Sequence, residues 1–100
     1  MIISGGENIA SLELERVIQK MPEIKEVAVV GIQSEKWGEV PVAVVVCNDG
    51  ETIDIRSLDK HCRAHLAAFK VPKKLVITDS LPRNPSGKLL KRIIRQKVQN

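Results

Sequence analysis

Aromatic side chains are almost absent from this chain: its 100 residues include one tryptophan, one phenylalanine and no tyrosine. Proteins that bind single-stranded nucleic acid usually stack the bases on aromatic rings, so the composition disfavours that class. The chain also has no apolar run close to the roughly 20 residues that a transmembrane helix needs, and its start shows no secretory signal pattern. We therefore expect a cytoplasmic protein with no transmembrane segment.

Cysteine is equally scarce, with only Cys47 and Cys62. Two cysteines make no disulfide framework, and their spacing matches no metal-binding motif, so we expect two reduced, mostly buried thiols. His61 and His65 share one face of a predicted helix. A zinc site would need further ligands, however, and the glutamate of an H-E-x-x-H motif is absent. We expect two surface histidines and no metal site.

Acidic residues are nearly missing from the C-terminal part of the chain. Residues 61–100 carry ten Lys or Arg against one acid, a balance of +9, whereas residues 1–60 carry six against eleven, a balance of −5. Such a split suggests that the C-terminal part meets an anionic partner. The candidates are a nucleic acid, a nucleotide or phosphate ligand, and an acidic protein surface.

The remaining composition is typical of one soluble globular domain, with 43% hydrophobic and 28% charged residues. Some apolar residues cluster as in buried strands, and others recur at helical spacing. The sequence predicts a β-hairpin followed by αββαβα, which is an α+β domain with a small, mostly antiparallel three-stranded sheet packed with helices. The predicted elements are a hairpin over 1–9, helices over 11–21, 54–69 and 88–98, and strands over 27–32, 40–47 and 75–78.

Four single residues carry more specific expectations. Ser11 and Asp54 are predicted helix N-caps, because their side-chain oxygens can accept a bond from the first helical turn. Pro41 is expected at a strand start or on a sheet edge, because proline has no N–H for the ladder. Trp37 lies in a polar loop between two strands. It either closes the rim of the core or offers a flat surface to an adenine ring.

The segment 81–91 combines two prolines, a serine and a glycine with two lysines. Pro82 and Pro85 fix φ and favour extended neighbours, whereas the serine and glycine that follow allow a turn. The result is a stiff loop that presents Lys88 where a helix begins. It is not a P-loop, because the upstream glycine and the Ser or Thr after the lysine are absent. Two interpretations remain: a connection whose lysine is solvated, or an arm that reaches a phosphate.

Several short segments, each modest alone, occur together in one order. They are ISGGENI at 3–9, LELE at 12–15, EKWGE at 35–39, FKVPK at 69–73 and LPRNPSGK at 81–88. This series resembles the C-terminal domain of the adenylate-forming enzymes, the superfamily of acyl-CoA synthetases, peptide-synthetase adenylation domains and luciferases. The resemblance covers essentially the whole chain. It implies that residues 1–100 are a single mobile lid domain, excised just after the hinge to a large N-terminal adenylation domain.

The resemblance also implies a two-step ligase reaction on a fatty or aryl acid, with ATP and CoA as substrates. Lys88 matches the family's catalytic lysine, which bridges the acyl carboxylate and the nucleotide phosphate in adenylation. Gly5 and Gly6 match the loop that lines the pantetheine tunnel in the thioester step. Mg²⁺ is expected in the full-length enzyme, bound mainly outside this domain. The domain alone is expected to be inactive.

Three further positions, Trp37, Phe69 and Lys73, match residues that contact the CoA nucleotide in some acyl- and aryl-CoA ligases of the family. Val71 departs from relatives that carry an arginine there, which implies that fewer charges hold CoA. The motifs lean toward CoA ligases, although CoA and the pantetheine of a carrier protein both stay open as acceptors. The alternative function is a stand-alone small α+β regulatory or RNA-binding module, which the basic C-terminal part favours.

Overall fold

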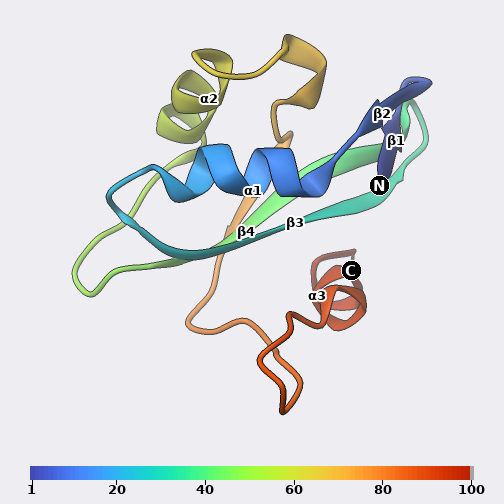
Figure 1. The fold of residues 1–100 in the computed structure, drawn as a ribbon. Helices are drawn as coiled ribbons and strands as arrows, with labels where there is room; N and C mark the ends of the chain where they lie inside the picture. The colour runs from blue at the N-terminus through green and yellow to red at the C-terminus, as the bar shows by residue number, and fades with distance from the viewer. Residues whose placement is uncertain (100) are drawn as a thin grey trace.

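The computed structural model describes residues 1–99 and confirms the predicted α+β class and element order (Figure 1). Among these residues, no helix is both long enough and apolar enough to cross a membrane. The elements are β1 (Ile2–Ser4), β2 (Glu7–Ile9), α1 (Ser11–Gln19), β3 (Ile24–Ser34), β4 (Gly38–Cys47), α2 (Ile55–Arg63), the 3-10 helix η1 (Ala68–Lys70), β5 (Lys74–Ile77) and α3 (Lys91–Gln99).

All five strands belong to one sheet. Its order is β2-β1-β4-β3. Strand β5 also pairs with β4, on the edge opposite to the one that pairs with β3. The contact of β1 with β4 is the single pair Ser4–Gly38, whereas β5 runs parallel to residues 42–45 of β4. The other strand pairs are antiparallel. The predicted three strands are therefore present, and the hairpin extends the same sheet to five.

Pro41 lies inside the central strand β4, opposite Gly31 of β3, and not at a strand start or sheet edge as predicted. Its carbonyl accepts a hydrogen bond from the Lys73 N–H at 2.9 Å, so the polar backbone of Pro41 faces β5 and not β3. On that side the proline falls between the β1 contact and the start of the β5 pairing. The missing N–H therefore removes no ladder bond.

Helices cover both faces of the sheet (Figure 1). The hairpin, α1 and α2 bury one face in a cluster that includes Leu14, Val45 and Leu58. On the other face, α3 and the loop before it form a second cluster with Leu81 and Ile94. Burial on both sides explains why β3 and β4 are nearly continuous apolar runs.

The two predicted helix caps have different outcomes. Asp54 caps α2 as predicted: its Oδ1 accepts from the Ser57 N–H at 2.8 Å, and the Ser57 hydroxyl accepts from the Asp54 N–H at 3.2 Å. The Ser57 backbone bond, aided by the Ser57 hydroxyl, lowers the pKa of the Asp54 carboxyl, because it favours the charged form. The prediction for Ser11 is wrong. Ala10 is the N-cap of α1, without a side-chain bond, and Ser11 is the first helical residue.

Three helix boundaries differ from the prediction, and the smallest difference is in α1, which ends at Gln19 and not at residue 21. Helix α2 ends at Arg63, and Phe69 belongs to the separate helix η1. Helix α3 begins at Lys91, so Lys88 lies in the preceding loop and not at a helix start. In the latter two cases apolar residues continue at helical spacing beyond the helix, because the adjoining loop also packs on the core. Periodicity alone therefore made these helices too long.

Ion pairs join the acidic N-terminal part of the chain to the basic C-terminal part. Of the five ion pairs found among residues 1–99, only one, Arg63–Asp59, lies within a helix. The other four connect the two parts of the chain, so the charge split alone does not require an external anion. These four pairs are Lys70–Glu13, Arg83–Glu26, Lys91–Glu15 and Arg95–Glu39.

Candidate functional site

Lys88 lies on a minimal β-hairpin that spans residues 83–89. The two ends of this segment, Arg83 and Leu89, pair as an antiparallel bridge. Inside the bridge, the Asn84 N–H donates to the Lys88 carbonyl at 2.9 Å. Leu89 packs against the core on the α3 side of the sheet. Because side chains alternate along an extended limb, Lys88 faces the opposite way, toward solvent.

The tip of this hairpin is a four-residue turn, 84–87, closed by a bond of 2.9 Å from the Gly87 N–H to the Asn84 carbonyl. Pro85 stands at the first central position, where its fixed φ suits a type I turn. Gly87 follows with a φ of +88°, a left-handed conformation that glycine adopts without strain. The structure thus confirms the predicted turn, in the form of a type I turn followed by a glycine bulge.

The Lys88 side chain is exposed and has no hydrogen-bonding or ion-pair partner among residues 1–99. Three other basic residues of this region differ in this respect, because Arg83, Lys91 and Arg95 are each paired with an acid. An ammonium group on a stiff turn, without an internal partner, is available to an anionic ligand.

Four of the other predicted site residues line one surface pocket of about 290 Å³. Gly5 comes from the β1–β2 turn, Trp37 from the β3–β4 turn, Phe69 from η1, and Lys73 from the residue before β5. The fold therefore brings together positions that are scattered along the sequence. Gly6, the fifth predicted residue, is not part of this lining. We call this the Trp37 pocket.

Gly5 and Trp37 are in direct contact in this pocket. The Gly5 N–H donates to the Trp37 carbonyl at 2.8 Å, and Gly5 has a φ of +57°. A Cβ added at Gly5 would lie 3.3 Å from Cε3 of the indole. Both the backbone conformation and the neighbouring ring therefore favour glycine here, whether or not a ligand is bound.

The two aromatic rings of the Trp37 pocket remain open to solvent. Trp37 is 45% exposed and Phe69 40% exposed, so Trp37 does not seal the core. A lysine lies near each ring: Lys36 Nζ is 5.0 Å from the indole centroid, and Lys70 Nζ is 5.7 Å from the phenyl centroid. Exposed rings with cations beside them can hold a flat ligand that carries negative charge.

Two charged residues of this pocket, Glu7 and Arg63, were not predicted. Arg63 lies at the end of α2, with its Nε 2.8 Å from Asp59 Oδ2, and adds a second cation beside Lys73. Val71, where some relatives carry arginine, is only 1% exposed and belongs to the core. No sequence pattern indicated Arg63, because its approach to the pocket depends on how α2 packs beside η1.

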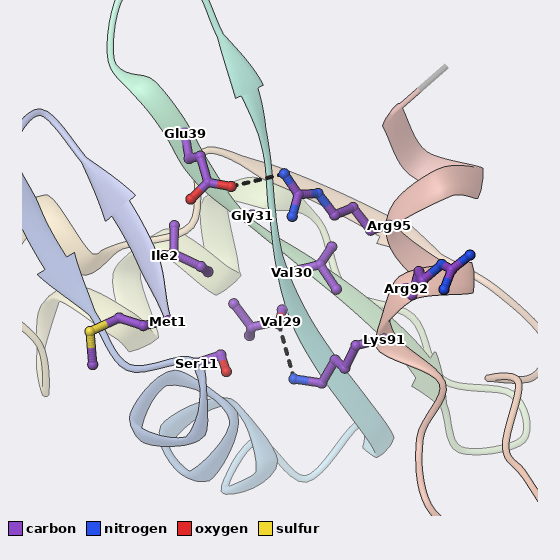
Figure 2. Close-up of a pocket in the computed structure, with 10 residues that line it drawn as sticks. All are labelled: Met1, Ile2, Ser11, Val29, Val30, Gly31, Glu39, Lys91, Arg92 and Arg95. Carbon is purple, nitrogen blue, oxygen red and sulfur yellow. Dashed lines mark hydrogen bonds and ion pairs between the residues drawn. The ribbon is translucent and has the colours of Figure 1, made fainter.

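A different hollow, of about 340 Å³, lies between α1, α3 and the free edge of β3 (Figure 2). Lys91 Nζ donates to the Val29 carbonyl at 3.1 Å and also to Glu15, whose carboxylate accepts from the Val29 N–H at 2.8 Å. Nearby, Arg95 pairs with Glu39 at 2.9 Å. None of the predicted site residues lines this hollow. It is a junction that holds both helices to the sheet.

The cysteines and His61 contribute to the packing of the fold and do not line the Trp37 pocket. Cys47 and Cys62 are free thiols, partly buried and buried respectively. Burial, with a smaller contribution from Asp59, raises the pKa of the Cys62 thiol to about 11, so it is un-ionised at neutral pH. His61 is not the surface residue predicted, because its Nε2 lies 2.7 Å from the Val17 carbonyl and joins α2 to α1. Among residues 1–99, no three His, Cys, Asp or Glu side chains form a group suited to a metal ion.

The family model for the AMP-binding enzyme C-terminal domain matches residues 13–88. The chain belongs to this family. The match runs from α1 to Lys88 in the 83–89 hairpin, and it confirms the resemblance to the adenylate-forming superfamily that the sequence motifs indicated.

Relatives of this AMP-binding C-terminal domain include two kinds of CoA ligase. The long-chain-fatty-acid–CoA ligase FadD13 of Mycobacterium tuberculosis is 45% identical over 96 residues, which is 96% of this chain and 19% of that protein. The indoleacetate–CoA ligase of Aromatoleum aromaticum is 48% identical over 98 residues, or 98% of this chain and 19% of that protein. The chain thus spans about a fifth of the length of the curated relatives it matches.

A solved structure shows the same fold. ATP-bound MatB from Rhodopseudomonas palustris matches with a TM-score of 0.93 and 39% identity, over 98% of this chain and 20% of that chain. At this similarity the backbone of the AMP-binding C-terminal domain described above is the common family fold.

Proposed function

We propose that this domain is the mobile C-terminal lid of an ATP-dependent acyl-CoA synthetase, which converts a fatty or aryl acid to its CoA thioester through an acyl-adenylate. The relatives named above support this activity, since they are a fatty-acid–CoA ligase, an indoleacetate–CoA ligase and an ATP-bound protein. The acid pocket and most ATP contacts belong to a large N-terminal domain in this proposal, so residues 1–100 alone are inactive. Nothing among the relatives supports the alternative of a regulatory or RNA-binding module.

In the adenylation step, Lys88 stabilises two reacting anions. A carboxylate oxygen of the acid attacks the α-phosphorus of ATP, a bond between them forms, and the bond to the β-phosphate oxygen breaks to release pyrophosphate. The ammonium group bridges the carboxylate and the phosphate and stabilises the charge that develops as pyrophosphate leaves. The stiff turn supports this role, because a positioned cation needs little reorganisation. A Mg²⁺ ion would neutralise further phosphate charge, and in this proposal it would be held mainly by the other domain, since residues 1–99 contain no group of three His, Cys, Asp or Glu that could hold a metal ion.

In the thioester step, the Trp37 pocket binds the nucleotide of CoA. The thiol sulfur attacks the acyl carbon, the thiol proton is lost to solvent, and the bond from the acyl carbon to the AMP oxygen breaks. Trp37 and Phe69 offer flat faces for the adenine, and Lys73 supplies a counter-charge for a phosphate. A base stacked on the exposed face of Trp37 takes the place of Lys36 there. Gly5 and Gly6 leave room for the pantetheine arm.

One observation carries the proposal: the candidate residues form two separate sets. The Lys88 hairpin packs on the α3 side of the sheet. The Trp37 pocket is built instead by the β1–β2 hairpin, the β3–β4 turn, η1 and the end of α2. A third hollow lies beside Lys88, and it shares no lining residue with the Trp37 pocket. Its lining consists of Asn84, Lys88, residues 89–93 and Gln96. Two separate surfaces on one rigid domain suit a reaction in which the domain rotates between two steps.

The test measures each half-reaction in the full-length enzyme. Lys88→Ala is expected to slow ATP–pyrophosphate exchange by about 10²–10³-fold, the range seen when one transition-state donor is removed. It is expected to keep most of the thioester formation from a supplied acyl-adenylate. The double variant Trp37→Ala/Lys73→Ala is expected to show the reverse pattern.

Lys74→Ala is the matched control, because Lys74 is an exposed lysine next to Lys73 that does not line the Trp37 pocket. It should leave both half-reactions unchanged. Equal loss of both half-reactions in the Lys88 or the Trp37/Lys73 variant would contradict the division into two surfaces. Supplying CoA and a pantetheine-loaded carrier protein in parallel identifies the acceptor. We place the enzyme in the cytoplasm, where both ATP and CoA are available, and cell fractionation tests this location.

A further inference from the structure

One side-chain oxygen organises the turn that carries Lys88. Oδ1 of Asn84 accepts three hydrogen bonds, from the Ser86 N–H at 3.1 Å, the Ser86 hydroxyl at 2.8 Å and the Lys88 N–H at 2.9 Å. The third of these bonds is made by the backbone of the lysine itself. The position of Lys88 therefore depends on the Asn84 side chain as well as on the two prolines of the loop.

The backbone donors of the turn show how much depends on this oxygen. Among residues 84–88, Pro85 has no N–H, and the other four N–H groups are all paired. Two of them, from Asn84 and Gly87, bond to backbone carbonyls inside the 83–89 hairpin. The other two bond to the Asn84 side chain. Half of the paired N–H groups of the turn thus converge on one atom.

Arg83 ties the same turn to the sheet. Its Nη1 donates to the Gly87 carbonyl at 2.8 Å, and its Nε and Nη2 lie 3.2 and 2.6 Å from Oε1 of Glu26 in β3. The Asn84 side chain therefore bonds backbone groups within the hairpin, and the Arg83 side chain links the hairpin to β3. With both in place, the Cα of Lys88 has a fixed position relative to the sheet.

We propose that Asn84 is the positioning residue of Lys88 in the adenylation step, an inference that rests on the function proposed above. A lysine has a long flexible stem, so the place that its ammonium can reach is set by where the backbone puts its Cα. Asn84 touches no substrate in this proposal. It acts by holding the Lys88 N–H, and with it the direction in which the side chain leaves the turn.

Loss of this oxygen should affect catalysis more than folding. The hydrogen bonds of Asn84 are exposed, so water can replace them at little cost to stability. Catalysis is more sensitive, because a misplacement of about 1 Å can slow a reaction by about 10²-fold. The expected signature is an enzyme that folds normally but has a low kcat for adenylation.

The experiment compares Asn84→Ala, Asn84→Asp and Lys88→Ala in the full-length enzyme. Asn84→Ala is expected to lower kcat for pyrophosphate exchange by about 10- to 100-fold, with little change in the KM for ATP and in the thioester half-reaction. Asn84→Asp keeps an acceptor oxygen at the same place and is expected to recover most of the rate. Hydrogen–deuterium exchange of the peptide covering 83–89 should become faster in the alanine variant and stay slow in the aspartate variant.

A double variant separates positioning from general damage. If Asn84 acts through Lys88, then Asn84→Ala added to Lys88→Ala causes no further loss of pyrophosphate exchange. Asn48→Ala is the matched control, because Asn48 also bonds the backbone through its side chain, to the Pro22 carbonyl at 3.0 Å, in a different turn. It should leave pyrophosphate exchange unchanged.

Several outcomes would overturn the positioning role. They are an Asn84→Ala enzyme with parental adenylation, an aspartate variant no better than alanine, unchanged exchange at 83–89, or an additive loss in the double variant. Each of these leaves the role of Lys88 intact if Lys88→Ala has lost adenylation. If Lys88→Ala itself keeps full adenylation, the proposed function fails first, and the two failures are therefore distinguishable.

Discussion

The Lys88 hairpin and the Trp37 pocket are built in opposite ways. The hairpin is local: a type I turn and one side-chain oxygen shape seven consecutive residues, 83–89. The pocket is assembled from the β1–β2 turn, the β3–β4 turn, η1 and the end of α2. A local site depends mainly on its own turn chemistry, whereas an assembled site depends on the packing of the whole domain. Substitutions that act on packing and substitutions that act on one turn should therefore affect the two sites differently.

The largest effect is expected for Val71→Arg, which tests the packing behind the Trp37 pocket. Val71 is almost fully buried, so an arginine there places an unpaired charge in the core. We expect the free energy of unfolding to fall by about 3–5 kcal/mol, measured by denaturant titration. Lys73→Arg, two residues away and exposed, is the control and should be neutral. A stable Val71→Arg variant with tighter CoA binding would show that the pocket can accept the arginine of some relatives after all.

Gly5→Leu tests the turn that forms one wall of the pocket. The variant combines a strained φ with a clash against the Trp37 ring, so the thioester half-reaction is expected to fall by about 10²-fold, while adenylation persists. Gly50→Leu is a matched control, because Gly50 has a φ of +77° and open space around it, away from both sites. A Gly50 variant that loses thioester formation as strongly would attribute the effect to general strain.

Gly87→Ala applies the same conformational strain to the Lys88 hairpin. A Cβ there meets nothing within 4 Å, so the effect comes from the φ of +88° alone, at about 1–2 kcal/mol. Adenylation is expected to fall about tenfold or less, because the turn shifts but Lys88 remains. Gly50→Ala should match it in thermal stability and leave adenylation unchanged. If Gly87→Ala and Gly50→Ala had the same adenylation activity, a shift of the Lys88 hairpin would have no effect on this step.

The smallest effect concerns Asp54, which caps the helix beside the pocket. Its bonds to Ser57 hold the pKa of its carboxyl below the ordinary 3.8. A carboxyl with a lowered pKa in the folded state contributes stability above its unfolded pKa and loses it as pH falls through the folded pKa. Unfolding curves should therefore show a small loss of stability below about pH 4. The slope should be weaker in Asp54→Asn, and an unchanged slope would assign it to other carboxyls.

The difference between the two sites also explains what the sequence could predict. The hairpin turn, the β3 and β4 strands and the Asp54 cap depend on residues close together in the chain, and all were predicted. The residues assigned to CoA binding were grouped only through family resemblance. The fold brings four of those five residues to the Trp37 pocket, and their role in binding stays a prediction. No rule of spacing places Gly5 beside Trp37, because that contact exists only after the sheet has formed.

Three features that depend on side-chain contacts could not be predicted from the sequence. The charge split predicts an anionic partner, but it could not show that four of the described ion pairs use C-terminal cations to bind N-terminal acids. Arg63 was not predicted, because its place in the pocket depends on how the end of α2 lies relative to η1. Asn84 was seen only as part of a loop, because nothing in a sequence shows that one oxygen collects three donors. Local sequence patterns predict helices, strands and turns, but they do not show which side chains form ion pairs or hydrogen bonds with one another.

The junction between α1, α3 and β3, part of which Figure 2 shows, also changes the exposed edge of the sheet. Strand β3 lies at an edge of the sheet, and such edges recruit strands from other chains. Glu15 and Lys91 occupy both hydrogen-bonding groups of Val29 at the middle of that edge. A foreign strand would have to break an ion pair before it could add there. The same two side chains that fasten α1 and α3 to the sheet therefore also block this edge against the addition of another strand.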